Sequence, residues 1–297
     1  MHSTTSGALA SLPEQGPPAI RRPGVLAVGQ GQPVVLLHGS MSSKAQWSPL
    51  VQRLSHQFQV IAVDLHGYGD NLPPQGMDAF SVDEEIDFVR ARLDAVLGRP
   101  MPVHLVGHSY GGLVALRFAQ RLPAYVLSLA VYEPMVLNLL PADDPIAAPV
   151  HAAGSALTTL VGEHRVYEAA QVCIDFWSGD GTFAGLPLPA KAKMAAGAAP
   201  TALNFQAEVS CPLRLDDVRS IRAPALVLGG AHSPEAAQRI VRMLAAALPN
   251  SSANWLNTNH TGPVTASELV NPWISTFLEV EAAKFCSKST GAGRSTR

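Results

Sequence analysis

The chain has 297 residues, of which 47% are hydrophobic and 15% are charged, with 21 basic and 23 acidic side chains. This length exceeds the roughly 100–200 residues of an average domain, but α/β folds often keep a single core at this size, so we expect one domain that carries an insertion. The nearly neutral charge argues against nucleic acid or an anionic membrane surface as a partner.

Three scattered cysteines, Cys173, Cys211 and Cys286, are too few for a disulfide framework, and no CxxC motif or Cys/His cluster indicates a metal site. The N-terminal stretch MHSTTSGALASLPEQGPP lacks the basic start and the continuous apolar core of a secretion signal. No apolar run reaches the ~18 residues needed to span a bilayer. The sequence therefore predicts a cytoplasmic protein without a metal ion.

Residues 1–22 are rich in Ser, Gly and Pro, which predicts a disordered N-terminal segment. After them, short apolar runs alternate with amphipathic segments. Continuous apolar runs of this length are typical of strands that are buried on both faces of a parallel sheet. In chain order the runs are PVVLLHG at 33–39, FQVIAVDL at 58–65, MPVHLVGHS at 101–109, VLSLAVYE at 126–133, APALVLGG at 223–230 and SANWLN at 252–257.

The segments between the first apolar runs carry apolar side chains at helical spacing. These side chains are Trp47, Leu50, Val51 and Leu54 in the first segment, and Ile86, Val89, Leu93 and Val96 in the second. Ser81 and Glu84 are spaced as a capping box at the start of the second helix. The alternation of strands and helices predicts the α/β class, with a doubly wound, mostly parallel sheet joined by right-handed crossovers.

The alternation stops between residues 134 and 222, where helix-like stretches such as HAAGSALTTLVGEHRVYEAAQVCIDFW and AKAKMAAGA occur without a convincing strand. We interpret 134–222 as a helical insertion that lies over the carboxyl edge of the sheet, and 23–133 with 223–283 as the α/β core. Within a C-terminal helix that follows the last strand run, the Asn-Pro pair at 271–272 predicts a restart, with Asn271 as N-cap and Pro272 at the first position. The polar, basic residues 284–297 predict a disordered tail.

A GxSxG sequence, Gly107-His108-Ser109-Tyr110-Gly111, lies between the strand run PVHLV and the helix-like run LVALRFAQRL. Glycines around a serine at such a turn allow the strained elbow that exposes a nucleophilic hydroxyl at the top of a sheet. The helix N-terminus behind it offers backbone N–H groups and a positive dipole end to an oxyanion. We therefore predict that Ser109 is a nucleophile and that the N–H of Tyr110 is one donor of an oxyanion hole.

Two further motifs complete a candidate catalytic site. The sequence HGSM, which begins at His38, follows the strand run VVLL, and the backbone N–H of Ser40 is the predicted second oxyanion donor. His260 lies in NTNHTGP after the last strand run, from where a histidine can reach over the sheet to Ser109 and act as its general base. His108, which flanks the serine, is expected to pack rather than to react.

Together these motifs resemble the α/β-hydrolase superfamily, from about Val34 to Leu278. The resemblance rests on HGSM at 38–41, DLHGYGDN at 64–71, GHSYGG at 107–112, ALVLGG at 225–230 and NHTGP at 259–263. In such enzymes the histidine follows the serine and comes after the last strand, and a helical cap often follows the sixth strand, where 134–222 lies here. Dehalogenases and many epoxide hydrolases of this superfamily use an aspartate nucleophile, so Ser109 argues against both.

The position of the triad acid departs from the resemblance. Superfamily members usually carry an aspartate shortly after the strand that corresponds to ALVLGG, whereas this chain has Ser233, which we expect to cap the following helix. Glu133, at the end of the run VLSLAVYE, is the predicted substitute because some dehalogenases of the superfamily place their acid at this strand end. Glu235, another acid and no acid at all remain alternatives. Asp64 is expected to order its own loop.

These residues predict a serine hydrolase that cleaves a carboxylic ester or lactone through an acyl-enzyme, without a metal or an organic cofactor. The alternatives are a hydrolase of a carbon–carbon bond in a vinylogous diketone, a cofactor-free lyase or acyltransferase, and a ligand-binding protein that kept the fold. Trp177 and Phe183 of the insertion are candidate substrate-binding residues, although such side chains also form an insertion's own core. The expected partner is a small, apolar, ester-like molecule.

Overall fold

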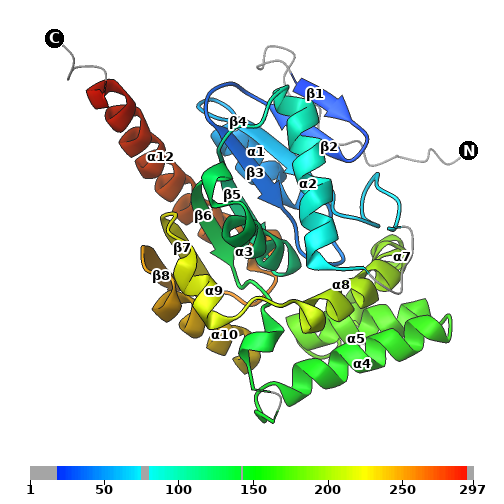
Figure 1. Ribbon diagram of the computed structural model, residues 1–297. Helices are drawn as coiled ribbons and strands as arrows, with labels where there is room; N and C mark the ends of the chain where they lie inside the picture. Colours follow the sequence, from blue (N-terminus) through cyan, green and yellow to red (C-terminus); the bar gives the residue numbers. More distant parts are fainter. Residues whose placement is uncertain (1–18, 75–79, 142, 293–297) are drawn as a thin grey trace, which may run out of the picture.

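The computed structural model describes residues 19–74, 80–141 and 143–292 of the chain. Within these residues, eight strands form one sheet in the order β1-β2-β4-β3-β5-β6-β7-β8 (Figure 1). The pairs from β4-β3 to β7-β8 along this order are all parallel. β1 pairs antiparallel with β2, and β2 pairs antiparallel with β4. The strands are β1 (Ala19–Arg22), β2 (Val25–Val28), β3 (Pro33–Leu37), β4 (Gln59–Val63), β5 (Val103–His108), β6 (Val126–Tyr132), β7 (Ala225–Gly230) and β8 (Ser251–Leu256). The predicted doubly wound, mostly parallel α/β sheet is confirmed.

The antiparallel edge changes the expectation for the N-terminus. Residues 19–22, assigned from composition to a disordered segment, form β1 and pair with β2, with Ile20 opposite Ala27. The turn between the two strands places Gly24 at a φ of 73°, which glycine adopts without steric cost. Composition misses such a strand because its backbone hydrogen bonds come from a partner strand. Residues 1–18 lie outside the described part of the chain.

Helices cover both faces of the sheet (Figure 1). Val34 and Leu36 of β3 point to the face where α1 and α12 pack, and Val35 and Leu37 point to the face of α2, α3 and α10. Because successive side chains of a strand point to opposite faces, a strand buried on both sides needs the unbroken apolar run seen here. The flanking helices are α1 (Ser48–Leu54), α2 (Val82–Leu97), α3 (Tyr110–Arg121), α10 (Glu235–Ala247) and α12 (Ser267–Ala292).

The first two helices keep the predicted apolar stripes. Trp47 is fully buried but belongs to a short 3₁₀ turn, η1 (Lys44–Trp47), directly before α1. The capping box of α2 is confirmed: the Glu84 N–H donates to Ser81 Oγ at 3.3 Å, and the Ser81 N–H donates to Glu84 Oε2 at 2.8 Å. Local sequence signals therefore fix where α2 begins.

The C-terminal helix continues through the predicted restart and into the predicted tail. α12 begins at Ser267 and runs through Pro272 without a break, and it continues through 284–292, which we assigned to a disordered tail. Buried Val270, Ile274 and Leu278 hold the helix against the sheet across the proline. Tertiary packing thus overrides the local stop signal. None of the described helices, α12 included, is long and apolar enough to cross a membrane.

In the chain, a group of helices comes between β6 and β7, and its helices α4, α5 and α8 lie below the sheet in the view of Figure 1. They are η4 (Leu137–Leu139), α4 (Ala148–Gly162), α5 (Val166–Ser178), α6 (Thr182–Gly185), α7 (Leu188–Ala196), α8 (Ala198–Ser210) and α9 (Leu215–Ser220). No strand occurs in the described residues of this segment. α9 differs from the others because its Val218, with Ile221 just after it, joins the apolar core shared by α3 and α10. The end of the segment that we assigned to the insertion therefore packs with the sheet layer.

Candidate active site

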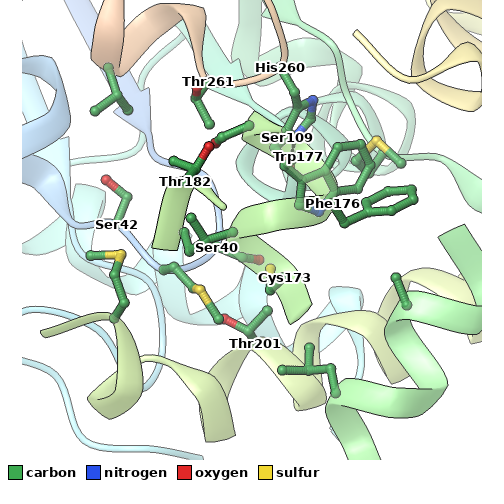
Figure 2. A pocket seen from close by; sticks show the side chains of 18 of the residues that line it. Ser40, Ser42, Ser109, Cys173, Phe176, Trp177, Thr182, Thr201, His260 and Thr261 are labelled. Carbon is green, nitrogen blue, oxygen red and sulfur yellow. Dashed lines mark hydrogen bonds between the residues drawn. The ribbon is translucent and has the colours of Figure 1, made fainter. Parts of the chain in front are cut away.

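Ser109 stands at the turn between β5 and α3. Its φ of 53° and ψ of −120° lie in a region that residues other than glycine rarely adopt. Such a conformation costs on the order of 1–3 kcal/mol and persists only where the surroundings fix it. Here the Ser109 carbonyl accepts from the N–H groups of Gly112 and Leu113, at 2.9 and 3.0 Å, and the Ser109 N–H donates to the Tyr132 carbonyl at 3.0 Å. The turn presents the serine to a cavity (Figure 2).

Two glycines of the motif allow this turn to close. A Cβ atom on Gly107 would lie 2.4 Å from the carbonyl oxygen of Gly111, and a Cβ atom on Gly111 would lie 2.4 Å from the carbonyl oxygen of His38. Both oxygens belong to the backbone and cannot rotate away. The GxSxG spacing is therefore a packing requirement of β5, α3 and the loop after β3.

A hydrogen-bonded series joins Ser109, His260 and Glu133. Ser109 Oγ lies 2.9 Å from His260 Nε2, and His260 Nδ1 lies 2.8 Å from Glu133 Oε2. The second carboxylate oxygen, Oε1, accepts from the Gly230 N–H at 2.6 Å, and all three side chains are buried. Because a carboxylate oxygen accepts, Nδ1 carries the imidazole proton and Nε2 is left to accept from the serine hydroxyl.

Glu133 reaches the histidine from the carboxyl end of β6. Its backbone has a φ of 42°, and its N–H donates to the Leu228 carbonyl of β7 at 2.9 Å, so the residue is anchored to the neighbouring strand. Glu235, the alternative acid, is the exposed first residue of α10. Within the described residues no hydrogen bond joins Glu235 to His260, so of these two carboxylates the structure brings Glu133 to the imidazole.

Ser233, at the position where the superfamily usually has its acid, does not cap α10. The helix begins at Glu235, with Pro234 before it and no side-chain cap, and the buried Ser233 Oγ has no hydrogen-bond partner among the described residues. Our expectation of a serine cap is therefore wrong. The backbone explains the difference: the Ser233 N–H donates to the Gly230 carbonyl at 3.3 Å, so Ser233 still belongs to the turn after β7 and comes too early to cap.

His108, next to the nucleophile, holds the loop that carries His260. Its Nε2 lies 2.8 Å from the His260 carbonyl oxygen. Burial, with His260 nearby, holds the pKa of His108 well below its usual value, so the ring is neutral and Nε2 donates its one proton to that carbonyl. The Tyr132 hydroxyl also donates to the Asn259 carbonyl, at 2.7 Å. Sequence reasoning predicted packing for His108 and missed this contact, which no local pattern reveals.

The predicted oxyanion donors are the backbone N–H groups of Ser40, which lines the same cavity as Ser109, and of Tyr110, which follows Ser109 in the chain. Within the described residues neither N–H donates a hydrogen bond. The Ser40 hydroxyl donates to Asn204 Oδ1 of α8 at 2.8 Å, which ties the loop after β3 to the insertion. His38 fixes the start of that loop, because its Nε2 accepts from the Leu65 N–H at 3.0 Å and burial lowers its pKa to about 4. An oxyanion hole requires unpaired N–H groups close to the nucleophile, so both residues stay candidates for this role.

Asp64 orders its own loop. Its fully buried carboxylate accepts from the N–H and the ammonium group of Lys44, at 2.7 and 2.6 Å, and from the Asp70 N–H at 3.1 Å. These contacts tie the loop after β4 to the start of η1, away from His260. In the part of the chain that the structure describes, no cluster of three or more His, Cys, Asp or Glu side chains could hold a metal ion.

A cavity of about 340 Å³ lies beside Ser109 and His260 (Figure 2). Its walls come from the loop after β3, from helices α4, α5, α7 and α8, and from the residues that follow His260. This volume and apolar lining are typical of a site for a small molecule. The larger apolar side chains of the lining are Met41, Met135, Val150, Leu157, Ile174, Phe176, Trp177, Leu186, Met194, Phe205 and Val264.

The two predicted substrate-binding aromatics differ in position. Trp177 lines the cavity and stacks on His260, with ring centroids 4.0 Å apart and an angle of 28° between the planes. Phe183 lies instead in the core of the insertion with Leu157 and Ala198, and it is absent from the cavity wall. The expectation that Phe183 contacts substrate is therefore wrong, since α6 turns this ring toward its neighbouring helices.

Comparison with known proteins places the chain among hydrolases. The sequence profile of the alpha/beta hydrolase family matches residues 34–271. The chain is 39% identical over 108 residues to the 2-hydroxy-6-oxo-2,4-heptadienoate hydrolase of Pseudomonas putida, but this match spans only 35% of the chain and 38% of that enzyme. It is 25% identical over 264 residues to the (E)-2-((N-methylformamido)methylene)succinate hydrolase of Acinetobacter baylyi, which covers 84% of the chain and 92% of that enzyme.

A solved structure agrees with the fold. The enol-lactonase from Burkholderia xenovorans LB400 matches 86% of this chain and 95% of its own, with a TM-score of 0.72 and 18% sequence identity. At this identity the match shows a common fold. The predicted superfamily is confirmed by the family profile, which covers most of the chain from β3 into α12. The chain belongs to the alpha/beta hydrolase family.

Proposed function

We propose that this protein is a serine hydrolase that cleaves a carboxylic ester or lactone through an acyl-enzyme. The observation that carries the proposal is the series of contacts from Ser109 through His260 to Glu133, with hydrogen bonds of 2.9 and 2.8 Å. Ser109 and His260 line an apolar cavity, and this supports an uncharged organic substrate. In this proposal Ser109 is the nucleophile, His260 the general base and Glu133 the acid that orients the imidazole.

In the first half of the reaction, His260 Nε2 takes the proton of Ser109 Oγ while this oxygen attacks the carbonyl carbon of the substrate. The resulting oxyanion accepts hydrogen bonds from the N–H groups of Ser40 and Tyr110. The imidazolium, stabilised by Glu133, then returns the proton to the leaving alcohol. The acyl group remains on Ser109 as an ester.

In the second half, water replaces the alcohol. His260 takes a proton from the water as its oxygen attacks the acyl carbon, and the same two N–H groups hold the second oxyanion. Collapse of this intermediate breaks the bond to Ser109 Oγ, which recovers its proton from His260. One water is consumed and one carboxylic acid is released. A lactone would yield a single hydroxy acid because its alcohol stays attached.

Labelling with a fluorophosphonate probe tests the nucleophile. We expect one phosphonyl adduct per chain, on the peptide that contains Ser109, because this hydroxyl is hydrogen-bonded to His260 and lines the cavity. Ser128 is also hydrogen-bonded to a histidine, His104, but both side chains are fully buried away from the cavity wall and should not react. Intact-mass analysis and peptide mapping measure the adduct. The variant Ser109→Ala should remain unlabelled, whereas Ser210→Ala, which removes an exposed serine of α8, should label like the wild type. An adduct that persists in Ser109→Ala would contradict the assignment.

A second candidate is hydrolysis of a carbon–carbon bond in a vinylogous diketone. Its support is the 39% identity to the heptadienoate hydrolase over 108 residues. The same serine and histidine would serve this reaction, with a carbanion rather than an alcohol as the leaving group. Parallel assays with aryl esters and with a dienoate diketone separate the two, because a dedicated carbon–carbon hydrolase should favour the diketone in kcat/KM.

The wall of the cavity should decide substrate range through Trp177. We expect Trp177→Ala to change the ratio of kcat/KM between short and long acyl esters by about tenfold, since the substitution enlarges an apolar wall beside His260. The control is Phe183→Ala, which removes a ring from the core of the insertion and should lower stability by ~3–5 kcal/mol without changing this ratio. A change in selectivity in Phe183→Ala alone would refute the assignment.

A further inference from the structure

Helix α8 turns a polar stripe toward the catalytic core. Thr201, Asn204 and Glu208 recur at three- and four-residue spacing and so share one face of the helix. The first two are paired: Thr201 Oγ1 lies 3.0 Å from the Tyr68 hydroxyl, and Asn204 Oδ1 accepts from the Tyr68 hydroxyl at 2.6 Å and from the Ser40 hydroxyl at 2.8 Å. The carboxyl group of Glu208 forms no hydrogen bond or ion pair with any described residue.

Glu208 lies on the wall of the cavity that also contains Ser109. Only 8% of its surface is exposed, and burial raises its pKa to about 8. The ionisable groups that interact with it are Tyr110 of α3, Cys173 of α5 and Cys211 after α8, and burial raises the pKa of each of these as well. None of the three is a cation. The two basic residues of α3, Arg117 and Arg121, form ion pairs with Asp83 instead.

The other helices around α8 offer no partner either. Lys193 of α7 lines the cavity and His151 of α4 contacts the ring of Phe205, but neither forms an ion pair with Glu208 in the described part of the chain. η4 contains no ionisable residue. Glu208 is not among the described residues whose fully buried side-chain atoms lack a partner, so its carboxyl group is accessible from the cavity that it lines. A ligand that enters the cavity would supply the missing hydrogen bond.

We propose that Glu208 is a specificity residue that hydrogen-bonds a hydroxyl or keto oxygen on the acyl part of the substrate. The proposal rests on the ester hydrolysis proposed above and narrows its substrate to esters of hydroxy or oxo acids. We assign the acyl part to the buried side of the cavity because the alcohol has to leave while the acyl group stays on Ser109. A protonated carboxyl both donates and accepts, so it matches a hydroxyl, which does the same, and a ketone, which accepts.

The test compares p-nitrophenyl alkanoates of increasing chain length with their ω-hydroxy and ω-oxo counterparts. The wild type should prefer an oxygenated ester by about tenfold or more in kcat/KM at the chain length that reaches Glu208. Glu208→Leu should lose this preference, with better hydrolysis of the plain esters. Glu208→Gln should keep it, because the amide still donates and accepts.

The pH dependence adds a second readout. Below pH 8 the Glu208 carboxyl is mostly protonated and can donate to a ketone, and this donor is lost as the pH rises through the pKa of about 8. The preference of the wild type for oxo esters should therefore fall above pH 8, while its preference for hydroxy esters, which can donate to a carboxylate, should persist. Glu208→Gln has no proton to lose, so its oxo preference should not change with pH relative to the plain esters.

A binding measurement separates failure of this proposal from failure of ester hydrolysis. In the Ser109→Ala protein, an ω-oxo ester should raise Tm more than the plain ester, and adding Glu208→Leu should remove the difference. If the wild type hydrolyses no ester, the proposed function fails while the Tm comparison still decides the role of Glu208. Equal preference in wild type and Glu208→Leu would overturn the proposal. A wild-type preference for ω-amino esters that Glu208→Gln loses would also overturn it. So would a lower Tm in Glu208→Leu than in the wild type, combined with a wild-type Tm in Glu208→Gln.

Discussion

Replacing His260 with alanine should lower kcat for ester hydrolysis by about 10⁶-fold, the size of loss expected when the general base of a serine triad is removed. The physical reason is that no other described side chain is hydrogen-bonded to Ser109 Oγ, so the attacking oxygen would keep its proton. Glu133 cannot replace the base because it meets the imidazole on the opposite nitrogen. Steady-state rates with an aryl ester, corrected for background hydrolysis, measure this loss of kcat.

Two further variants test whether the loss of kcat comes from the proposed role of His260. His232 is exposed and bonds to Asn257, so His232→Ala should leave kcat within a few-fold of the wild type. The double variant with His260→Ala and Glu133→Gln should be no slower than His260→Ala alone, because the acid acts only through the histidine. Additive losses in the double variant would mean that Glu133 acts on the substrate independently, which would contradict the proposed roles.

Replacing Glu133 with glutamine should lower kcat by up to about 10⁴-fold while the protein still folds. The amide matches the carboxylate in shape and can still accept from the Gly230 N–H. Its NH₂ group would then face His260 Nδ1 and donate to it, which forces the ring proton onto Nε2. An imidazole in that tautomer cannot accept the proton of Ser109, so the barrier to attack rises.

The matched control for this substitution is Glu235→Gln. Glu235 is exposed at the start of α10, so its amide should change kcat little. Circular dichroism and Tm should show a native fold for Glu133→Gln, because the substitution lowers kcat by changing the tautomer of His260 and leaves the packing unchanged. A drop in kcat of less than about tenfold would rule out Glu133 as the orienting acid, and a Ser–His dyad would become the better description.

Much of the fold follows from local patterns in the sequence. Unbroken apolar runs predicted β3 to β7 because strands buried on both faces cannot alternate in polarity. The run SANWLN also predicted β8, but this strand lies at the edge of the sheet and only its Leu256 is buried. The glycines around Ser109 predicted the elbow because any side chain at Gly107 or Gly111 would collide with backbone oxygens. Ser81 and Glu84 predicted the start of α2 because a capping box is local by nature. In each case a short pattern in the sequence was enough to predict the element.

Other elements depend on partners that are distant in the chain. Composition did not predict β1, because the hydrogen bonds of this strand come from β2. The Asn-Pro pair did not predict that α12 continues through Pro272, because packing against the sheet maintains the helix there. The sequence proposed Trp177 and Phe183 on equal terms, and the arrangement of the helices left only Trp177 on the cavity wall.

In the active site, too, some features follow from local sequence patterns and others from contacts between distant residues. The sequence by itself determined the family, the candidate nucleophile Ser109 and the candidate base His260, because their motifs are short and their order is fixed by the sheet. Only the tertiary structure could bring Glu133 rather than Glu235 to the imidazole, since that depends on a hydrogen bond between residues 127 positions apart. It also placed Glu208 without a partner in an apolar cavity. The sequence does not distinguish one glutamate from another, whereas burial and hydrogen-bond partners in the folded chain determine what each carboxyl group does.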